Sequence, residues 1–217
     1  MLTRMSGCCN PRGCERFFTR RFARRTARRY RKKGLDKTAL IMVEFLESRG
    51  IEGATVLEVG GGIGDIQVEL LRRGASHAVN LELSPAYEDE ASQLLREASV
   101  QDRAERRLHD IAVAPDEVEP ADVVVLHRVI CCYPDYQRLL GTAAGHARRL
   151  IVFSYPPRNI LSRLFVGAAN LVFRMLGREF RSFVHQPPKM LEVVEQGGFR
   201  QTLAHRGVVW QVAGLER

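Results

Sequence analysis

The sequence predicts an α/β fold in which a mostly parallel sheet carries helices on both faces. Short apolar segments alternate along the chain with segments whose apolar residues recur at helical spacing. Parallel strands need a crossover of a dozen or more residues, which a helix usually supplies. The 217 residues are enough for one full core, so we expect one domain with a short appendage.

Two helices precede this alternating pattern. Residues 16–33 repeat an Arg pair every four residues, which predicts a basic helix with a narrow aromatic stripe. The stripe consists of Phe18, Phe22, Thr26 and Tyr30. Residues 37–49 predict a second, amphipathic helix. We therefore divide the chain into a basic, Cys-containing arm and helix at 1–36 and a main domain at 37–217.

Strands and helices alternate from residue 55 onward, and the last part departs from this order. The expected strands cover residues 55–59, 78–82, 104–109, 121–126 and 150–154. The helices between them cover residues 65–73, 87–99 and 134–147. The last part predicts helices over 160–176 and 188–196 and a strand pair over 202–216. We expect a lid-like insertion at about 158–187; the alternative is a helix in the flank of the sheet.

Positive charge is concentrated near the N-terminus. The chain has 33 Lys and Arg against 25 Asp and Glu, a net charge of +8. Residues 1–37 alone carry +11, which leaves −3 for the rest. This distribution disfavours a nucleic-acid-binding surface. Three interpretations of the Arg-rich helix stay open: a solvated basic face, peripheral contact with anionic lipid headgroups, and docking of an acidic substrate or RNA.

The cysteines indicate a reducing compartment. There are five of them, Cys8, Cys9, Cys14, Cys131 and Cys132, and an odd number does not suit a secreted disulfide framework. The first residues lack the apolar stretch of a signal peptide, and no apolar run is long enough to span a membrane. We therefore expect a cytoplasmic protein without a metal site. If the arm folded over a pocket, the sulfurs could instead gather around a soft metal or metalloid.

A glycine-rich turn follows the first expected strand. Glu58 lies near the end of that strand, and Gly60, Gly62 and Gly64 follow at alternate positions. Glycines are needed where a chain turns tightly and a ligand approaches the backbone closely. Alone, this pattern would also fit an ordinary turn from a strand to a helix.

Two acidic residues at later strand ends strengthen the prediction of a cofactor site. Glu82 ends the second strand, where a carboxylate can accept both ribose hydroxyls, and Asp110 follows the third, near an expected adenine amino group. A nicotinamide dinucleotide is the nearest alternative. Its fingerprint would need a glycine where this chain has Asp65, whose carboxylate would repel a phosphate at the helix N-terminus. A sulfonium cofactor tolerates that carboxylate.

These features resemble the class I S-adenosylmethionine-dependent methyltransferases. The run Glu-Val-Gly-Gly-Gly-Ile-Gly from Glu58 to Gly64 resembles their motif I, and Glu82 and Asp110 resemble their ribose-binding and adenine-contacting acids. Val129–Asp135 is similar to their segment after the fourth strand. The resemblance covers about residues 37–217. It implies S-adenosyl-L-methionine as cofactor and a Rossmann-like, seven-stranded sheet of order 3-2-1-4-5-7-6, with strand 7 antiparallel.

The resemblance and the strand ends together define the expected site. The expected cofactor contacts are Glu58, Gly60, Gly61, Gly62, Gly64, Glu82, Leu83, Asp110, Ile111, Leu126 and His127. The expected acceptor contacts are Cys131, Cys132, Tyr133 and Tyr155, because ligands lie beyond the carboxyl ends of the strands. His127 is the candidate general base; its alternative is to contact the cofactor or pack under a loop.

The C-terminal part resembles the magnesium-protoporphyrin O-methyltransferases and, more loosely, quinone-ring O-methyltransferases. The similar segments are Tyr155-Pro-Pro, the long apolar helix, Gly198-Phe-Arg200 and Val209–Ala213. This resemblance implies O-methylation of a small, flat, hydrophobic acceptor with a carboxylate or hydroxyl. Three alternatives remain: methylation of a soft metal, metalloid or thiol, methylation of RNA, and a cofactor-binding module without catalysis.

Overall fold

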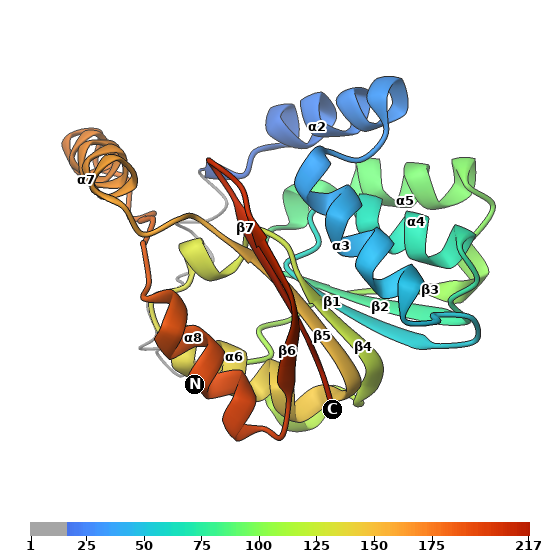
Figure 1. The fold of residues 1–217 in the computed structure, drawn as a ribbon. Coiled ribbons are helices and arrows are strands. Elements are labelled where there is room, and N and C mark those ends of the chain that lie inside the picture. Colours follow the sequence, from blue (N-terminus) through green and yellow to red (C-terminus); the bar gives the residue numbers. More distant parts are fainter. Residues whose placement is uncertain (1–16) are drawn as a thin grey trace, which may run out of the picture.

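Seven strands form one sheet in the computed structural model, which describes residues 17–217 (Figure 1). The strands are β1 (Thr55–Val59), β2 (His77–Glu82), β3 (Ala104–Leu108), β4 (Ala121–Leu126), β5 (Ala147–Tyr155), β6 (Arg200–Arg206) and β7 (Gln211–Glu216). Their order is β3-β2-β1-β4-β5-β7-β6, and β7 runs antiparallel to both of its neighbours. The predicted strand order and the antiparallel seventh strand are confirmed.

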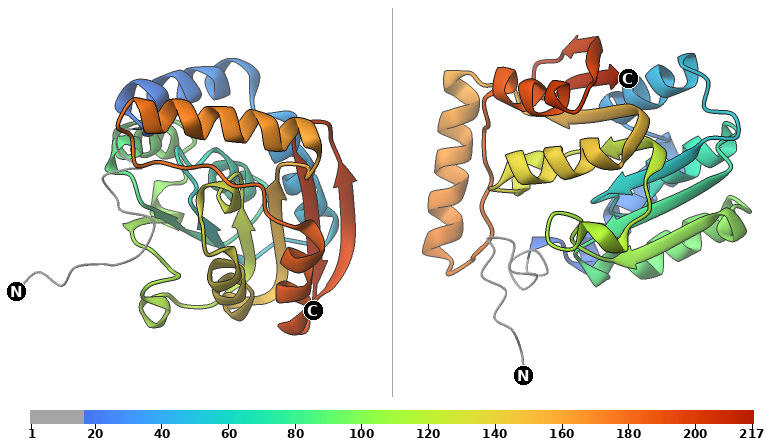
Figure 2. Two further views of the ribbon diagram at one scale, coloured as in Figure 1. Left: turned by 90° about the vertical axis from the view of Figure 1, so that its left-hand side faces the viewer. Right: turned by 90° about the horizontal axis from the view of Figure 1, so that it is seen from below.

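Helices cover both faces of this sheet. They are α2 (Arg20–Lys33), α3 (Lys37–Ser48), α4 (Asp65–Arg72), α5 (Glu88–Glu97), α6 (Tyr136–His146), α7 (Ile160–Met175) and α8 (Pro187–Gln196). Short 3₁₀ helices are η1 (Pro85–Tyr87), η2 (Gln101–Arg103), η3 (Pro115–Glu117) and η4 (Ile130–Cys132). Helices α3, α4 and α5 lie on one face, and α6 and α8 lie on the other (Figures 1 and 2). The structure thus has three layers.

Alternating side chains of the central strands build a hydrophobic core on each face. On β4, Val123 and Val125 pack into the core under α3 and α4, whereas Val124 packs into the core under α6. Successive side chains of a strand point to opposite faces, and both faces of this sheet are covered. Most positions of the central strands are therefore apolar, which explains continuous apolar runs such as Val123–Leu126.

The edge strand β3 has an unusual composition because charged side chains protect it. Arg106 forms an ion pair with Glu88 at 2.9 Å and donates a hydrogen bond to the carbonyl oxygen of Gly62 at 2.8 Å. Arg107 pairs with Glu105 on the same strand. Charged residues on an edge strand disfavour pairing with another chain. The predicted third strand is thus confirmed despite its weak apolar pattern.

The basic helix predicted at residues 16–33 is present as α2, and it packs against the layer of α4 and α5. The hydroxyl of Thr19 caps its N-terminus by accepting the backbone N–H of Phe22. Ala23 and Ala27 are fully buried, and the hydroxyl of Tyr30 donates to Glu69 of α4 at 2.6 Å. Helix α2 therefore shares the hydrophobic core of the rest of the chain.

The predicted boundaries agree with the structure to within a few residues, and β5 shows an instructive difference. This strand was expected over residues 150–154 but runs from Ala147 to Tyr155. Its first residues include Arg148 and Arg149, and these charged residues interrupt the apolar pattern that predicts a strand. The guanidinium of Arg149 donates to the carbonyl oxygens of Arg49 and Gly50, so its charge stays at the surface.

Helix α7 stands apart from the sheet, and none of its residues is buried. The alternative that it forms a core helix in the flank of the sheet is therefore wrong. The segment after it does contact the body. The backbone N–H of Phe183 donates to the carbonyl oxygen of Cys131, and His185 contacts the carbonyl oxygens of Ile130 and Tyr133. Within residues 17–217, no helix combines the length and hydropathy needed to cross a membrane.

We predict that Gly214→Ala destabilises the fold by about 1–3 kcal/mol through overpacking. A Cβ atom at Gly214 of β7 would lie 2.5 Å from a ring carbon of Phe45 on α3. Gly145→Ala in α6 is the matched control, because a Cβ there meets nothing within 4 Å. It should be neutral or stabilising, since alanine favours helix over glycine. Urea unfolding measures both, and equal stability of the two variants would contradict the close packing at Gly214.

Candidate functional site

A cavity of about 390 Å³ lies at the carboxyl ends of β1, β2 and β4. Ligands of open α/β sheets bind at this edge, where the strand order reverses, which here is between β1 and β4. Of the predicted site residues, the cavity is lined by Gly60, Gly61, Gly62, Glu82, Leu83, Asp110, Ile111, His127, Cys132 and Tyr133. The others, Glu58, Gly64, Leu126, Cys131 and Tyr155, do not line it.

The glycine turn brings the backbone between β1 and α4 close to its neighbours. Gly60, Gly62 and Gly64 have φ angles of 67°, 55° and 73°, in the left-handed region that favours glycine. A Cβ atom at Gly60 would lie 2.6 Å from Val129, and one at Gly61 would lie 2.1 Å from Asn80. The sequence pattern therefore reflects both backbone conformation and close packing.

Glu58 lies beneath this turn, within the protein. Its carboxyl group accepts a hydrogen bond from the side-chain amide of Asn80 at 2.9 Å. Burial raises the pKa of Glu58 to about 8, and the nearby carboxyl of Asp65 adds to the increase. Glu58 thus supports the glycine turn from below, whereas the sequence had suggested a direct cofactor contact.

Glu82 faces the cavity from the end of β2 and is held there by backbone amides. One carboxylate oxygen accepts the N–H of Gly62 at 2.8 Å, and the other accepts those of Leu83 at 2.7 Å and Ser84 at 3.0 Å. Burial raises the pKa of Glu82, and the three amides act in the opposite direction. The carboxylate is therefore fixed in orientation at the cavity wall.

Asp110 lies beyond the end of β3, where the spacing had placed it. One of its oxygens accepts the backbone N–H of Ala112 at 3.0 Å. The hydroxyl of Tyr133 lies 3.2 and 3.3 Å from its two carboxylate oxygens. The structure thus brings the predicted acceptor residue Tyr133 against the predicted adenine-contacting acid.

His127 has a polar group of the protein near each of its ring nitrogens. The hydroxyl of Ser154 lies 3.1 Å from Nδ1, and the carboxylate of Asp36 lies 3.5 Å from Nε2. Burial would raise the pKa of Asp36, but His127 and Arg128 together hold it well below its usual range. Asp36 also caps α3 by accepting the N–H of Thr38 and Ala39, so this carboxylate is rigidly placed.

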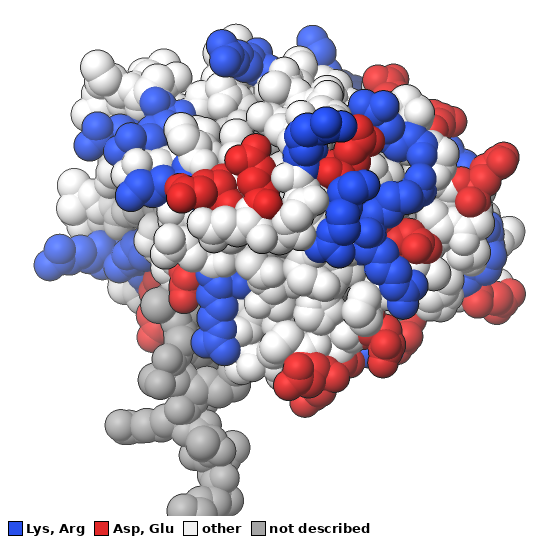
Figure 3. All heavy atoms as spheres, turned by 60° about the horizontal axis from the view of Figure 1, so that its bottom comes forward, with Lys and Arg blue, Asp and Glu red and all other residues white. Residues whose placement is uncertain are grey.

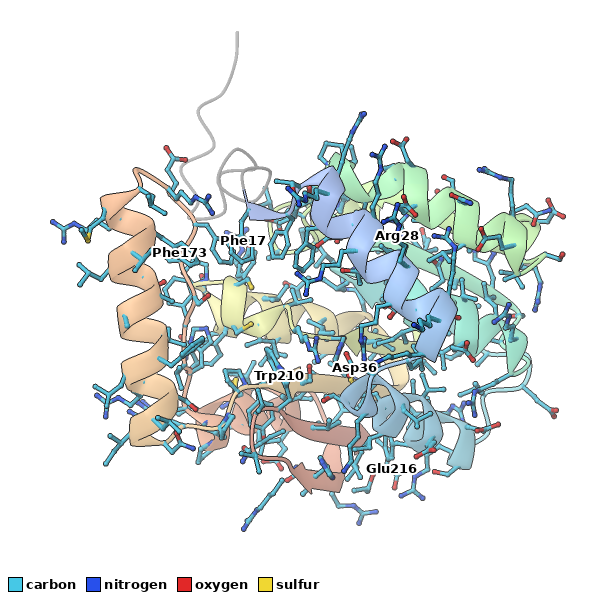
Figure 4. All side chains as sticks on the ribbon, turned by 90° about the horizontal axis from the view of Figure 1, so that it is seen from above. Phe17, Arg28, Asp36, Phe173, Trp210 and Glu216 are labelled. Carbon is cyan, nitrogen blue, oxygen red and sulfur yellow. The ribbon has the colours of Figure 1, made fainter. Side chains whose placement is uncertain are left out.

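Arg128 places a guanidinium beside the same carboxylate. It pairs with Asp36 at 2.8 Å, and its guanidinium carbon lies 5.0 Å from the ring centroid of Trp210. Figure 4 labels Asp36 and Trp210. The φ of Arg128, at 59°, is left-handed, which is uncommon for a residue with a side chain. Its backbone N–H donates to the hydroxyl of Ser154 at 2.9 Å, which holds the turn after β4. Asp36, His127 and Arg128 therefore form one polar cluster at the cavity wall.

The cysteines that the structure describes lie in the turn after β4. The sulfurs of Cys131 and Cys132 are 3.6 Å apart, and only Cys132 lines the cavity. Cys8, Cys9 and Cys14 fall outside the described residues. Among residues 17–217, no group of three or more His, Cys, Asp or Glu side chains could hold a metal ion.

Helix α2 supplies a wall of the cavity that the sequence did not assign to the site. Its contribution consists of Phe22, Thr26 and Arg29, together with Phe18 just before the helix. The i+4 aromatic stripe was the available signal, but periodicity alone does not distinguish a stripe that faces a cavity from one that faces a core. Asp36 was missed for a similar reason, because its position is that of an ordinary helix cap.

The family comparison agrees with this geometry. The model of the family described as Methyltransferase domain matches residues 19–202, most of the chain. The chain belongs to this methyltransferase family. The predictions of a class I S-adenosylmethionine-dependent methyltransferase and of a transferase enzyme are thereby confirmed. The match begins at residue 19, so it includes α2, which lines the cavity.

The three similar solved structures described next are methyltransferases as well. The magnesium protoporphyrin IX methyltransferase from Synechocystis PCC 6803, with bound SAH, has a TM-score of 0.69 and 18% identity over 83% of this chain and 82% of that chain. An O-methyltransferase family protein from Burkholderia thailandensis has a TM-score of 0.65 and 19% identity over 92% of this chain and 63% of that chain. Geranyl diphosphate C-methyltransferase from Streptomyces coelicolor A3(2) has a TM-score of 0.63 and 16% identity over 82% of this chain and 78% of that chain. These similarities establish the fold. Among curated proteins, none matches the sequence.

We predict that Glu58→Gln removes part of the pH dependence of stability of the methyltransferase. Between the ordinary pKa of 4.5 and the folded value of about 8, the folded state keeps a proton that the unfolded state releases. The free energy of unfolding therefore falls as the pH rises through this window, by at most about 1.4 kcal/mol per pH unit for one group. Urea unfolding from pH 5 to pH 8 measures the slope.

Glutamine keeps an oxygen for Asn80 and cannot ionise, so the variant should show the shallower slope. Glu119→Gln is the control, because Glu119 is exposed and should leave the slope unchanged. A Glu58→Gln variant with the wild-type slope would show that the buried carboxyl is not protonated in this range.

Proposed function

We propose that this methyltransferase binds S-adenosyl-L-methionine in the cavity and methylates a small hydrophobic or aromatic acceptor, with oxygen as the favoured acceptor atom. The observation that carries the proposal is the convergence of Glu82 and Asp110 on one cavity beside the glycine turn. We retain the cytoplasm as the proposed compartment.

The residues present fit this cofactor. Gly60, Gly61 and Gly62 line the cavity without side chains, so a ligand can lie against the backbone of the turn. The carboxylate of Glu82 is held in place at the end of β2, where it would accept ribose hydroxyls. Asp110 and Ile111 lie at the neighbouring strand end, where they would contact the adenine. The volume of about 390 Å³ lies in the usual range for small-molecule sites.

Apolar residues in the wall of the cavity support the proposal of a hydrophobic acceptor. Phe18 and Phe22 line the cavity on the side of α2, and Leu139 and Tyr133 line it on the side of α6 and the turn after β4. Two of the similar structures are named for porphyrin and isoprenoid substrates. Arg29, which also lines the cavity, would suit a carboxylate on the acceptor.

The chain's own residues would align the reactants and exclude water. When bound, S-adenosylmethionine supplies an electrophilic methyl group on a sulfonium. Aligning the acceptor atom with that methyl group lowers the barrier by proximity and orientation. A hydroxyl acceptor must also lose a proton, and we propose His127 as the residue that takes it. The Asp36 carboxylate, 3.5 Å from Nε2, would stabilise the resulting imidazolium.

We predict that Glu82→Ala weakens binding of S-adenosylmethionine at least about tenfold, since hydrogen bonds to a charged group contribute roughly 1.5–3 kcal/mol. Titration calorimetry measures the affinity. Glu105→Ala, which removes a carboxylate from the outer strand β3 away from the cavity, is the control and should bind normally. Absence of binding by the wild-type protein at millimolar cofactor would overturn the proposal.

We also predict label transfer from S-adenosylmethionine carrying a trideuterated methyl group to one class of acceptor. The panel includes porphyrin carboxylates, phenols, quinols, thiols, arsenite and RNA, and mass spectrometry detects the product. We expect the label on an oxygen atom of a flat aromatic acceptor. The Glu82→Ala variant should not produce this labelled product. Labelling of arsenite, thiols or RNA alone would contradict it.

The same assay tests the role of His127. If His127 takes the proton, His127→Gln should lower kcat by about 10²–10⁴ while the affinity for the cofactor stays within a few-fold. A weaker cofactor affinity with unchanged kcat would instead assign His127 to cofactor contact, the alternative that the sequence left open.

A further inference from the structure

Helix α7 presents its apolar face away from the protein. Seven apolar residues recur at helical spacing and are exposed on that face: Leu161, Leu164, Phe165, Ala168, Leu171, Val172 and Met175. Phe165 is 74% exposed and Met175 is 79% exposed. A surface helix normally turns its apolar face inward, so this orientation is inverted. Exposed apolar patches of this kind mark interaction sites.

The inward face of α7 explains why the helix is nevertheless held in place. The side-chain amide of Asn170 donates to the carbonyl oxygen of Ser182 at 2.8 Å, and its oxygen accepts the N–H of Ser182 at 2.9 Å. Phe173 packs against Phe17 and Phe180, with ring centroids 5.5 and 5.6 Å away. These contacts fix the helix with its apolar residues outward.

Positive charge accompanies this apolar face. The segment from residue 156 to residue 178 carries four arginines and no acidic residue: Arg158, Arg163, Arg174 and Arg178. Helix α2 adds Arg21, Arg25, Arg28 and Lys32, which share one face of that helix and form no ion pair among the described residues. Arg20, Arg24 and Arg31 instead pair with carboxylates of α5, and Arg29 lines the cavity.

The two helices lie on the same side of the molecule. Phe17, just before α2, stacks on Phe180 with a centroid distance of 4.3 Å and contacts Phe173 of α7. In Figure 4, Phe17 and Phe173 lie between the two helices, and Figure 2 shows both along one side. The surface turned forward in Figure 3 instead shows Lys and Arg interspersed with Asp and Glu. The apolar helix α7 and the unpaired cations of α2 thus flank one aromatic cluster.

We propose that this side binds the surface of an anionic lipid bilayer, with α7 lying in the interface and the free cations of α2 over the headgroups. A helix that has an apolar face, a cationic flank and no acidic residue suits such an interface. Helix α7 has 16 residues, none of them buried. Phe18 and Phe22 line the cavity beside the same aromatic cluster, so the cavity lies next to the lipid-binding side.

Vesicle flotation with the full chain tests this inference. The vesicles contain either phosphatidylcholine alone or phosphatidylcholine with one quarter phosphatidylglycerol, at low salt and at high salt. We expect at least tenfold tighter binding to the anionic vesicles and weaker binding at high salt. No cofactor or acceptor is present, so the outcome is independent of the proposed function. Absence of binding to the anionic vesicles at low salt would overturn the inference.

Two sets of variants separate the apolar and the charged contributions. The triple variant Leu164→Ser, Phe165→Ser and Leu171→Ser should lose at least tenfold in binding. Its control is Leu108→Ser with Val113→Ser, which removes exposed apolar residues near the β3 edge and should bind normally. Arg21→Glu, Arg25→Glu and Arg28→Glu should remove the preference for anionic vesicles. The matched control Arg96→Glu, Arg138→Glu and Arg200→Glu changes the net charge equally at other exposed positions.

Two further results would overturn the inference. Unchanged binding of the serine variant would exclude α7 as the inserted element. The second result comes from sedimentation experiments: the wild type self-associates, the serine variant does not, and the wild type does not bind vesicles. That result would show that α7 packs against a second copy. Thermal unfolding of each variant checks that the fold is retained.

Discussion

Three backbone amides converge on the carboxylate of Glu82, and the arrangement of the cavity depends on this interaction. The amide of Gly62 comes from the turn after β1, and those of Leu83 and Ser84 come from the loop after β2. One side chain therefore ties together the two loops that border the same side of the cavity. Arg106 extends the connection, because it donates to the carbonyl oxygen of Gly62 from the edge strand β3.

Helix α2 performs two roles through different faces. Its buried face carries Ala23 and Ala27 and joins the core, while the neighbouring Phe22 and Arg29 reach the cavity. The remaining face is basic and faces solvent. A truncation of the whole helix would therefore disturb the fold and the cavity together, which is why surface charge reversals are the better test of its electrostatic role.

The sequence was most informative where one physical cause dominates. Continuous apolar runs such as Val123–Val125 predicted the central strands, because both sheet faces are covered. The glycine turn, Glu82 and Asp110 were found by spacing along the chain. Asp36 and the wall formed by α2 were missed because their place in the cavity depends on packing between elements distant in sequence. Glu58 was assigned to the cavity, yet the register of β1 directs its side chain beneath the turn toward Asn80.

Strand β7 lies between β5 and β6 although it follows both of them in the chain. In this sheet β6 pairs with β7 alone, so β6 has no partner until the later strand is synthesised. The edge of the sheet at β5 therefore stays unpaired while the ribosome synthesises the residues before β7. It is covered only when β7 pairs with β5 and β6. During that interval the backbone groups of β5 that later pair with β7 have no partner strand. Nascent chains stalled before residue 211 are thus expected to be the species that chaperones bind and that aggregate most readily.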